Sequence, residues 1–182
     1  MKTTITTLSK ILAATALLAS AGLAQAAGPT GGATPANIAV SATIVAKCTI
    51  STTAVAFGEY DPVTGSNVTA EGSVEVACTK GSSGLSVGLG DGANYASSTR
   101  NMNGGTSSDK LAYSLVQPTG NAVGDPCPAF SSGTAWTTAS ALTLTSPLAK
   151  TARTYKVCGQ IAAGQDKSVD SYTDTVVATI NF

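Results

Sequence analysis

The side chains that most often do chemistry in proteins are sparse in this sequence. Histidine is absent, which excludes the Ser-His-Asp and Cys-His catalytic arrangements. One Ser-x-x-Lys pattern occurs at Ser107–Lys110, but its usual companions Ser-Asp-Asn and Lys-Thr-Gly are missing, and we interpret it as chance in a Ser-rich turn. Asp170 and Asp174 flank Tyr172. Two carboxylates can serve acid–base catalysis, but we favour solvated side chains near a strand end. We therefore predict a protein that is not an enzyme.

Motifs for cofactors are equally weak. The glycines of Gly88–Gly92 alternate with other residues, which is not the G-x-G-x-x-G spacing of a phosphate-binding loop, so we predict a turn there. Asp91 and Asn94 offer two oxygen ligands, too few for calcium. The lack of both histidine and a C-x-x-C pair argues against zinc. Trp136, the only tryptophan, suits a sugar-binding surface or, more commonly, core packing. We expect no metal and no other cofactor.

The sequence begins with features of an exported protein. Residues 1–26 are typical of a signal peptide, with two lysines, an apolar run too short to span a bilayer, and an Ala-x-Ala cleavage site at Ala24–Ala26. Residues 27–37 are rich in glycine and proline, which predicts a flexible leader. Loss of the signal leaves eight basic side chains against ten acidic ones. The lysines are scattered singly, so nucleic acid is not an expected partner.

Cysteine content agrees with export. All four cysteines, Cys48, Cys78, Cys127 and Cys158, lie in the mature part, and an even number in an oxidising compartment predicts two disulfides. Three connectivities are possible. We favour Cys48 with Cys78 and Cys127 with Cys158, each closing a loop of about 30 residues and each stabilising the fold by about 3 to 4 kcal/mol.

The elements that position these residues are predicted to be short β-strands. Alternating apolar residues recur in stretches separated by Gly-, Pro-, Asn- and Asp-rich turns, and no mature window has a convincing helical period. The stretches are Ile38–Ala46, Cys48–Phe57, 73–78, 85–89, 111–115, 142–144, 155–161 and Tyr172–Phe182. Seven or eight strands in one domain of this size predict an all-β sandwich or barrel.

The two ends of the mature chain have complementary patterns. In the last stretch Val176, Ala178, Ile180 and Phe182 share one face, and no residue follows to cover that face by a hairpin, so we expect another segment to cover it. The stretch 38–46 has its own alternating face, formed by Ile38, Val40, Ala42 and Ile44. It suits either the first strand of the domain or a strand supplied to another copy, because β-strand addition pairs backbones and fills pockets with alternate side chains.

A family resemblance favours the second possibility. The segments Phe57–Pro62, Gly72–Thr79, Val87–Gly92, Arg100–Met102, Leu111–Leu115, Val157–Ile161 and Tyr172–Phe182 together resemble the spore coat protein U domain, over about Lys47 to Phe182. This family includes major subunits of archaic chaperone-usher pili. The resemblance implies an immunoglobulin-like β-sandwich that lacks its last strand, with residues 47–182 as the domain.

What the resemblance implies for function follows from that missing strand. Ile38, Val40, Ala42 and Ile44 would be donor residues, and Val176, Ala178, Ile180 and Phe182 would line one wall of an acceptor groove. Cys48 and Cys78 match a disulfide common in the family. The chain would be secreted through the periplasm, meet a periplasmic chaperone and an outer-membrane usher, and polymerise with identical subunits into a surface fibre for adhesion, to a host or abiotic surface, and biofilm formation. The alternatives are a self-contained secreted coat or surface protein and a sugar-binding adhesive module.

Overall fold

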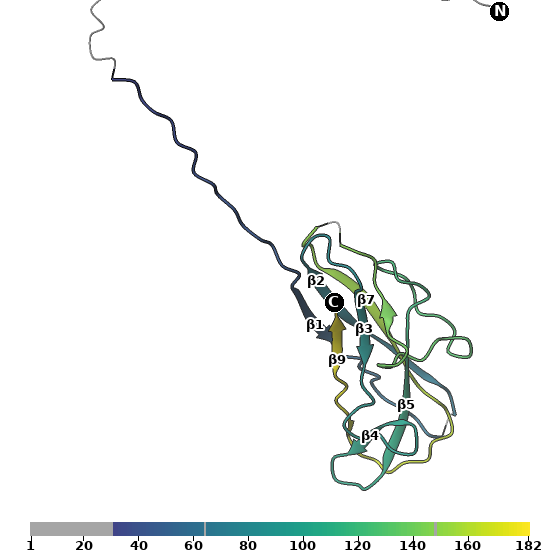
Figure 1. The fold of residues 1–182 in the computed structure, drawn as a ribbon. Coiled ribbons are helices and arrows are strands. Elements are labelled where there is room, and N and C mark those ends of the chain that lie inside the picture. The colour runs from purple at the N-terminus through teal and green to yellow at the C-terminus, as the bar shows by residue number, and fades with distance from the viewer. Residues whose placement is uncertain (1–30, 64, 148) are drawn as a thin grey trace, which may run out of the picture. The chain divides into compact units, whose positions relative to one another are not determined.

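The structure is a computed structural model that describes residues 31–63, 65–147 and 149–182. Its strands form two antiparallel sheets (Figure 1). One sheet has the order β1 (Cys48–Thr53), β2 (Val68–Cys78), β7 (Arg153–Ile161), β5 (Lys110–Val116), β4 (Arg100–Gly104) and β8 (Tyr172–Thr173). The other has the order β6 (Leu142–Thr143), β3 (Ser86–Leu89) and β9 (Ala178–Asn181). No helix occurs among the described residues. The predicted all-β, immunoglobulin-like sandwich is confirmed.

The core lies between the two sheets and follows the predicted alternation. On β2, Val74 and Val76 are 1% and 0% exposed, whereas Glu75 between them is exposed. On β3, Leu85, just before the strand, and Val87 are buried in the same way from the opposite sheet. The remaining core members are Cys78, Leu89, Leu111, Tyr113, Leu115, Trp136, Leu142, Leu144, Tyr155, Val157 and Ile161. Each large side chain removed from water contributes about 1.5 to 3 kcal/mol, so this cluster drives the packing of the two sheets.

Trp136 and Arg100 join the two sheets by hydrogen bonds inside the core. Trp136 is fully buried, and its indole Nε1–H donates to the carbonyl oxygen of Val87 at 2.7 Å. Arg100 is 7% exposed and donates to the carbonyl oxygens of Gly90 at 2.6 Å and Trp136 at 2.8 Å. Buried donors and acceptors cost free energy unless they are paired, so this network satisfies backbone groups that loops would otherwise leave unpaired.

The sequence predicts one strand over Tyr172–Phe182, and this is wrong in detail. The structure divides the stretch into β8, which pairs with β4 of the large sheet, and β9, which pairs with β3 of the small sheet. Residues 174–177 cross from one sheet to the other. The alternating pattern continues through the crossing because these residues still present alternate side chains to the core.

The segment after β1 also departs from the expected strand. β1 ends at Thr53, although the Thr- and Val-rich pattern continues to Phe57. Val55 and Phe57 instead pack over two glycines of the large sheet. A Cβ atom on Gly72 would lie 2.6 Å from the carbonyl oxygen of Thr53, and one on Gly159 would lie 2.5 Å from Cγ1 of Val55. The lack of a side chain at these two positions therefore lets the segment close over the core.

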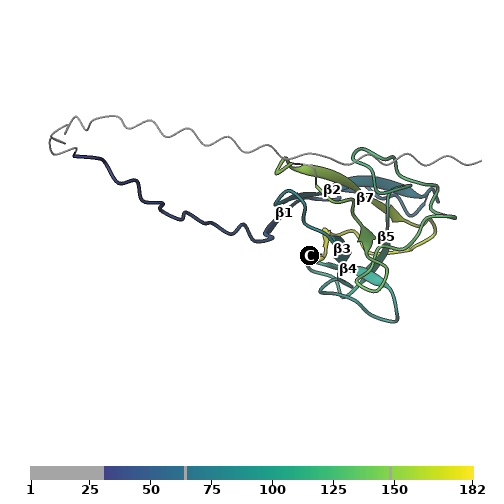
Figure 2. The same ribbon diagram turned by 45° about the horizontal axis from the view of Figure 1, so that its top comes forward.

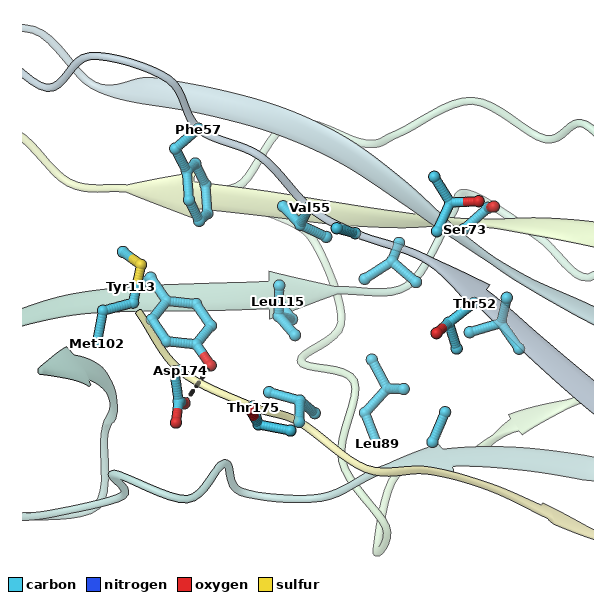
Figure 3. A pocket seen from close by; sticks show the side chains of 16 residues that line it. Thr52, Val55, Phe57, Ser73, Leu89, Met102, Tyr113, Leu115, Asp174 and Thr175 are labelled. Atoms are coloured by element: carbon cyan, nitrogen blue, oxygen red, sulfur yellow. Dashed lines mark hydrogen bonds between the residues drawn. The ribbon is translucent and has the colours of Figure 1, made fainter. Parts of the chain in front are cut away.

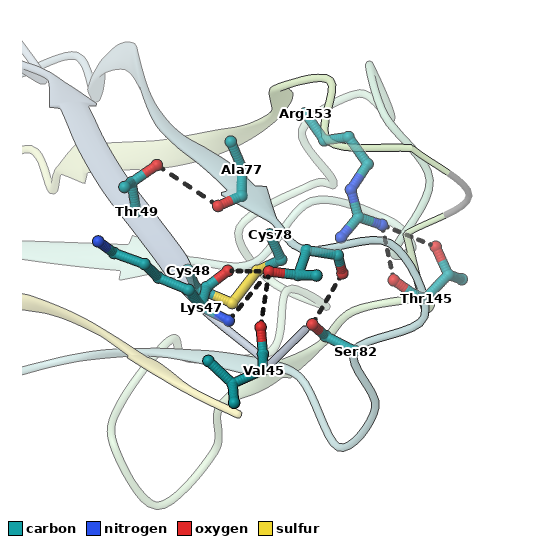
Figure 4. The surroundings of a disulfide bond; sticks show 10 residues. Val45, Lys47, Cys48, Thr49, Ala77, Cys78, Ser82, Thr145 and Arg153 are labelled. Atoms are coloured by element: carbon teal, nitrogen blue, oxygen red, sulfur yellow. Dashed lines mark hydrogen bonds between the residues drawn. A yellow bond between two sulfur atoms is a disulfide. The ribbon is translucent and has the colours of Figure 1, made fainter. Parts of the chain in front are cut away.

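Two disulfides staple the sandwich, in the connectivity favoured from the sequence. Cys48 and Cys78 are directly opposed at the first pair of β1 and β2, with a Cα–Cα distance of 4.1 Å (Figure 4). Cys127 and Cys158 join the loop after β5 to β7, with a Cα–Cα distance of 5.7 Å. The described part of the chain has no free cysteine.

The sandwich has two distinct ends, which we name for later use. At the extension end, Thr79 follows β2, its backbone N–H donates to the carbonyl oxygen of Lys47, and Gly81 N–H donates to Pro147. This end comprises residues 45–47, 79–85, 144–147 and 149–153. At the far end, Val68 of β2 pairs with Ile161 of β7. This end comprises residues 54–63, 65–67, 90–99, 105–110, 162–171 and 174.

Candidate functional site

An open groove lies between the edge strands of the two sheets. β1 is an outer strand of the six-stranded sheet and β9 is an outer strand of the three-stranded sheet, and the two lie side by side (Figures 1 and 2). A cavity of about 270 Å³ opens between them, and Figure 3 shows the side chains that line it. Its floor is core: Leu89, Leu115 and Val157 among others. The groove therefore gives access to apolar surface between two strands that do not pair with each other.

On one side of the groove, backbone hydrogen-bonding groups of β9 are directed outward. The carbonyl oxygen of Val177 accepts from Gly90 N–H at 2.8 Å, so the backbone groups of Val177 face β3. Because successive residues of a strand direct these groups to opposite sides, those of Ala178 and Ile180 face away from β3, toward the groove. β9 thus offers a row of donors and acceptors to an additional strand.

The same argument applies to β1 on the other side. The carbonyl oxygen of Lys47 accepts from Thr79 N–H at 2.9 Å, so backbone groups of alternate residues from Lys47 onward face β2. Those of Ile50 and Thr52 face the opposite way, toward the groove. The groove is therefore bounded by two strand edges, and a strand that enters it could bond to either.

The residues predicted to line the acceptor wall lie on β9 and just before and after it. Val176, Ala178 and Ile180 are half-buried against the core, and the first two line the cavity. Phe182 follows β9 and is 57% exposed. Val177, just before β9, is 66% exposed. The sequence did not indicate the facing wall, which is formed by Val55, Phe57 and their neighbours.

A polar cluster closes the groove at the far end. The hydroxyl of Tyr113 donates to Oδ2 of Asp174 at 2.6 Å, and the backbone N–H and side-chain amide of Asn94 both donate to Oδ1 at 3.0 Å. Burial, and then the hydrogen bond and charge of Asp174, raise the pKa of Tyr113 above its ordinary value. The cluster fixes the point where the chain leaves β8 for β9, and so positions one wall of the groove.

This pKa shift predicts a loss of stability at alkaline pH. A tyrosine whose pKa is higher in the folded than in the unfolded state stabilises the fold below the unfolded pKa, near 10, and that stabilisation is lost as pH rises above it. We expect the free energy of unfolding to fall above pH ~10, and to fall less steeply, by up to about 1.4 kcal/mol per pH unit, in Tyr113→Phe. Urea denaturation between pH ~8 and ~11 measures this, and identical slopes for the two proteins would contradict it.

The other residues considered for chemistry hold loops, lie near a turn or are buried in the core. Asp170 accepts hydrogen bonds from the backbone N–H groups of Thr106 and Ser107, at 2.8 and 2.7 Å, so it and Asp174 each hold a separate loop. The Ser107–Lys110 pattern lies in and beside the turn between β4 and β5. Trp136 is fully buried, which rules it out as an exposed sugar platform. The described residues contain no cluster of three or more potential metal-ligating His, Cys, Asp or Glu side chains.

A second cavity, of about 760 Å³, opens at the far end among loops. Phe57, Tyr60, Asp170 and Tyr172 are among its lining residues. Its walls are mixed in polarity, and Tyr60 and Tyr172 use their hydroxyls to bond the carbonyl oxygens of Ala162 and Ser168. It has no row of unpaired strand groups, so the groove between β1 and β9 is the better candidate for strand binding.

The predicted donor segment is exposed. Residues 31–47 carry no strand, and Ile38, Val40 and Ile44 are 88%, 91% and 85% exposed, with Ala42 also exposed. The chain is held from Val45 onward: the hydroxyl of Thr79 donates to the carbonyl oxygen of Val45 and accepts from the N–H of Lys47. The body of the domain therefore begins within three residues after Ile44.

Two of the expectations for the N-terminus cannot be followed in the structure. The predicted signal peptide, residues 1–26, and the first four residues of the leader lie outside the described residues. Within the described part of the chain, no helix is long and apolar enough to cross a membrane.

Fold and groove together define an immunoglobulin-like β-sandwich with one open edge. The family model for the Spore Coat Protein U domain matches residues 34–179, and the chain belongs to this family. Membership of a family named for a coat protein places the chain among structural proteins and not enzymes, as expected from the sequence. The match begins before β1 and includes residues 38–46.

A solved structure shares the fold. It is the complex of the chaperone CsuC with the tip adhesion subunit CsuE, from archaic chaperone-usher Csu pili of Acinetobacter baumannii. The alignment has 19% sequence identity and a TM-score of 0.51, and covers 77% of this chain and 40% of that chain. No curated protein matches the sequence. The present chain thus spans less than half the length of that solved chain, and the likeness concerns the fold.

Proposed function

We propose that this protein is a structural pilus subunit, secreted through the periplasm to the cell surface, whose groove is filled by residues 38–46 of a second copy. The observation that carries the proposal is the pair of strand edges, β1 and β9, whose outward backbone groups flank an opening to the core. An inserted strand would satisfy the backbone groups of an edge and cover the apolar floor at the same time.

The donor segment suits this groove by its side chains. Ile38, Val40 and Ile44 are spaced to lie on one face of a strand, and Ala42 between them is small. Burial of the three large side chains would contribute about 5 to 9 kcal/mol before the cost of ordering and association is subtracted. Ser41 and Thr43 lie on the opposite face, where polar side chains remain in water.

Before assembly, the open groove needs temporary protection. Exposed core surface and unpaired strand edges promote aggregation. We infer that a periplasmic chaperone covers the groove first and that an outer-membrane usher exchanges it for the donor segment of the next subunit. The similarity of the fold to a structure of a chaperone–subunit complex supports the role of a chaperone. The resulting fibre would serve in adhesion to a host or abiotic surface and in biofilm formation.

Deletion of residues 27–46 tests the donor role. We expect the shortened chain, exported with its own signal, to give a folded body with both disulfides that forms no oligomers, because its groove is intact and its donor strand is gone. Unboiled surface and periplasmic extracts, compared with boiled ones on gels, would show a ladder for the unaltered chain and a single band for the deletion.

The matched control keeps the extension and removes only its apolar face. A chain with Ile38, Val40 and Ile44 replaced by serine should behave as the deletion does, whereas replacement of the opposite face, Ser41 and Thr43, by alanine should preserve the ladder. A normal ladder from the deleted chain contradicts the proposal. A stable monomer from the unaltered chain would instead favour a self-contained surface protein closed by its own segment.

A further inference from the structure

Charged side chains are sorted between the two ends of the sandwich. The extension end carries four cationic side chains, and its described residues include no carboxylate: Lys47, Lys80, Lys150 and Arg153. The far end carries seven carboxylates, Glu59, Asp61, Asp91, Asp109, Asp166, Asp170 and Asp174, against two cations, Lys110 and Lys167. The lysines are scattered in the sequence, and only the fold gathers three of them with Arg153 at one end.

Among the residues that the structure describes, the positive charges of the extension end have no anionic partner. Lys47, Lys80 and Lys150 are exposed. Arg153 is half-buried and donates from Nη1 to the carbonyl oxygen of Thr145 at 2.6 Å (Figure 4). The ion pair found among the described residues lies elsewhere, between Lys156 and Glu71 in the middle of the large sheet. The extension end therefore presents uncompensated positive charge.

The negative charges of the far end are held in place by its loops. Asp109 accepts hydrogen bonds from the backbone N–H and the hydroxyl of Ser168, and Asp170 accepts from backbone groups. These hydrogen bonds lower the pKa of both carboxyls below the ordinary value, so they stay ionised in mild acid. Glu59 and Asp166, on loops of the same end, are exposed. The far end thus presents a fixed negative charge.

The length of the connection brings two such ends together when a groove is filled. Only Val45–Lys47 separate the donor residue Ile44 from β1, and three residues span at most about 10 Å. β9 runs from the far end toward the extension end. A donor strand antiparallel to β9 would therefore leave the groove at the far end, and the donor's extension end would face it. A parallel donor would instead place two positive ends together.

We propose that the basic extension end of each copy docks on the acidic far end of the copy whose groove it fills, and that this contact sets the direction of the inserted strand. The inference rests on the proposed function. At physiological ionic strength the Debye length is about 8 Å, comparable with the longest possible connection, so the attraction is felt at the junction. Complementary ends also favour an open head-to-tail chain over a closed pair.

The test measures the rate at which the full chain forms the oligomer ladder. The protein is purified from the periplasm, unfolded with its disulfides intact, and diluted to start assembly. In about 10 mM salt, where the Debye length is about 30 Å, we expect Lys80→Glu with Lys150→Glu to assemble about tenfold more slowly than the unaltered chain. Adding Glu59→Lys and Asp166→Lys to this variant leaves both ends close to neutral, so the rate should stay low and should no longer depend on salt.

Glu75→Lys is the matched control, because it changes the charge on the side of the large sheet and should leave the rate near that of the unaltered chain. In about 1 M salt, where the Debye length is about 3 Å, all variants should assemble at similar rates. Equal rates in low salt would overturn this inference while the ladder itself upholds the proposed function. An assembly rate of the unaltered chain that does not change with salt concentration would also overturn the inference. This measurement requires no variant. Absence of a ladder from the unaltered chain would overturn both.

Discussion

Replacing Ala178 by aspartate is expected to abolish assembly of the chain into oligomers while leaving the isolated body folded. Ala178 lines the cavity of the groove from β9, at the point where an inserted strand would lie. In the open groove a carboxylate remains in contact with water. When the groove is filled, the same carboxylate must leave water without a partner, which costs several kcal/mol. A cost of about 3 kcal/mol reduces the affinity for a donor segment by more than a hundredfold.

The neighbouring residue provides the control for this prediction. The side chain of Thr179 is exposed and faces away from the core. Thr179→Asp therefore introduces the same charge into the same strand without entering the groove, and we expect a normal ladder on unboiled gels. Thermal unfolding of each body, followed by circular dichroism, separates an effect on folding from one on assembly. A full ladder from Ala178→Asp would show that the groove is not where copies join.

Replacing Trp136 by alanine is expected to destabilise the body more than any other single truncation. The indole is fully buried, and its loss leaves a cavity between the sheets. Truncation of a buried tryptophan costs about 3 to 5 kcal/mol. The carbonyl oxygen of Val87 also loses its donor, which adds about 1 to 3 kcal/mol where water does not replace it. Such a sum approaches the whole stability of an ordinary domain, about 5 to 15 kcal/mol.

Two variants show which part of the effect is packing. Trp136→Phe keeps most of the ring volume but loses the hydrogen bond, and should cost less than half as much. Tyr95→Ala removes an aromatic ring that is 45% exposed, and should change stability by less than about 1 kcal/mol. Urea denaturation is followed by circular dichroism, because Trp136 is the only tryptophan and its fluorescence is lost with it. A small effect of Trp136→Ala would contradict the packing described here.

The features that the sequence predicted are those set by local periodicity. Alternation on β2 and β7 places Val74, Val76, Tyr155 and Val157 in the core, because side chains of a strand alternate between its faces whatever the partner. The disulfide pairing, favoured because each bond closes a loop of about 30 residues, is also confirmed. The exposed apolar face of residues 38–46 could be read in the same way, and its role as a donor stays a prediction.

The features that the sequence did not predict depend on contacts between distant segments. No local pattern marks Arg100 as a buried side chain. Its burial depends on hydrogen bonds to the carbonyl oxygens of Gly90 and Trp136, which only the fold brings close to it. β1 ends at Thr53 because the residues after it close over the core. They have room to do so because Gly72 and Gly159, far along the sequence, carry no side chain. The sorting of charge to two ends likewise arises from topology and has no local pattern.

The disulfide between Cys48 and Cys78 has a mechanical consequence. β1 is an outer strand, held on one side by β2 and continuous with the segment that would reach into a neighbouring molecule. Tension along that segment acts first on the hydrogen bonds of Val45 and Lys47 with Thr79 and then at Cys48, where an outer strand would begin to peel from its sheet one hydrogen bond at a time. The covalent bond lies at this first pair of residues, so the load passes directly into β2, and through it into the middle of the large sheet.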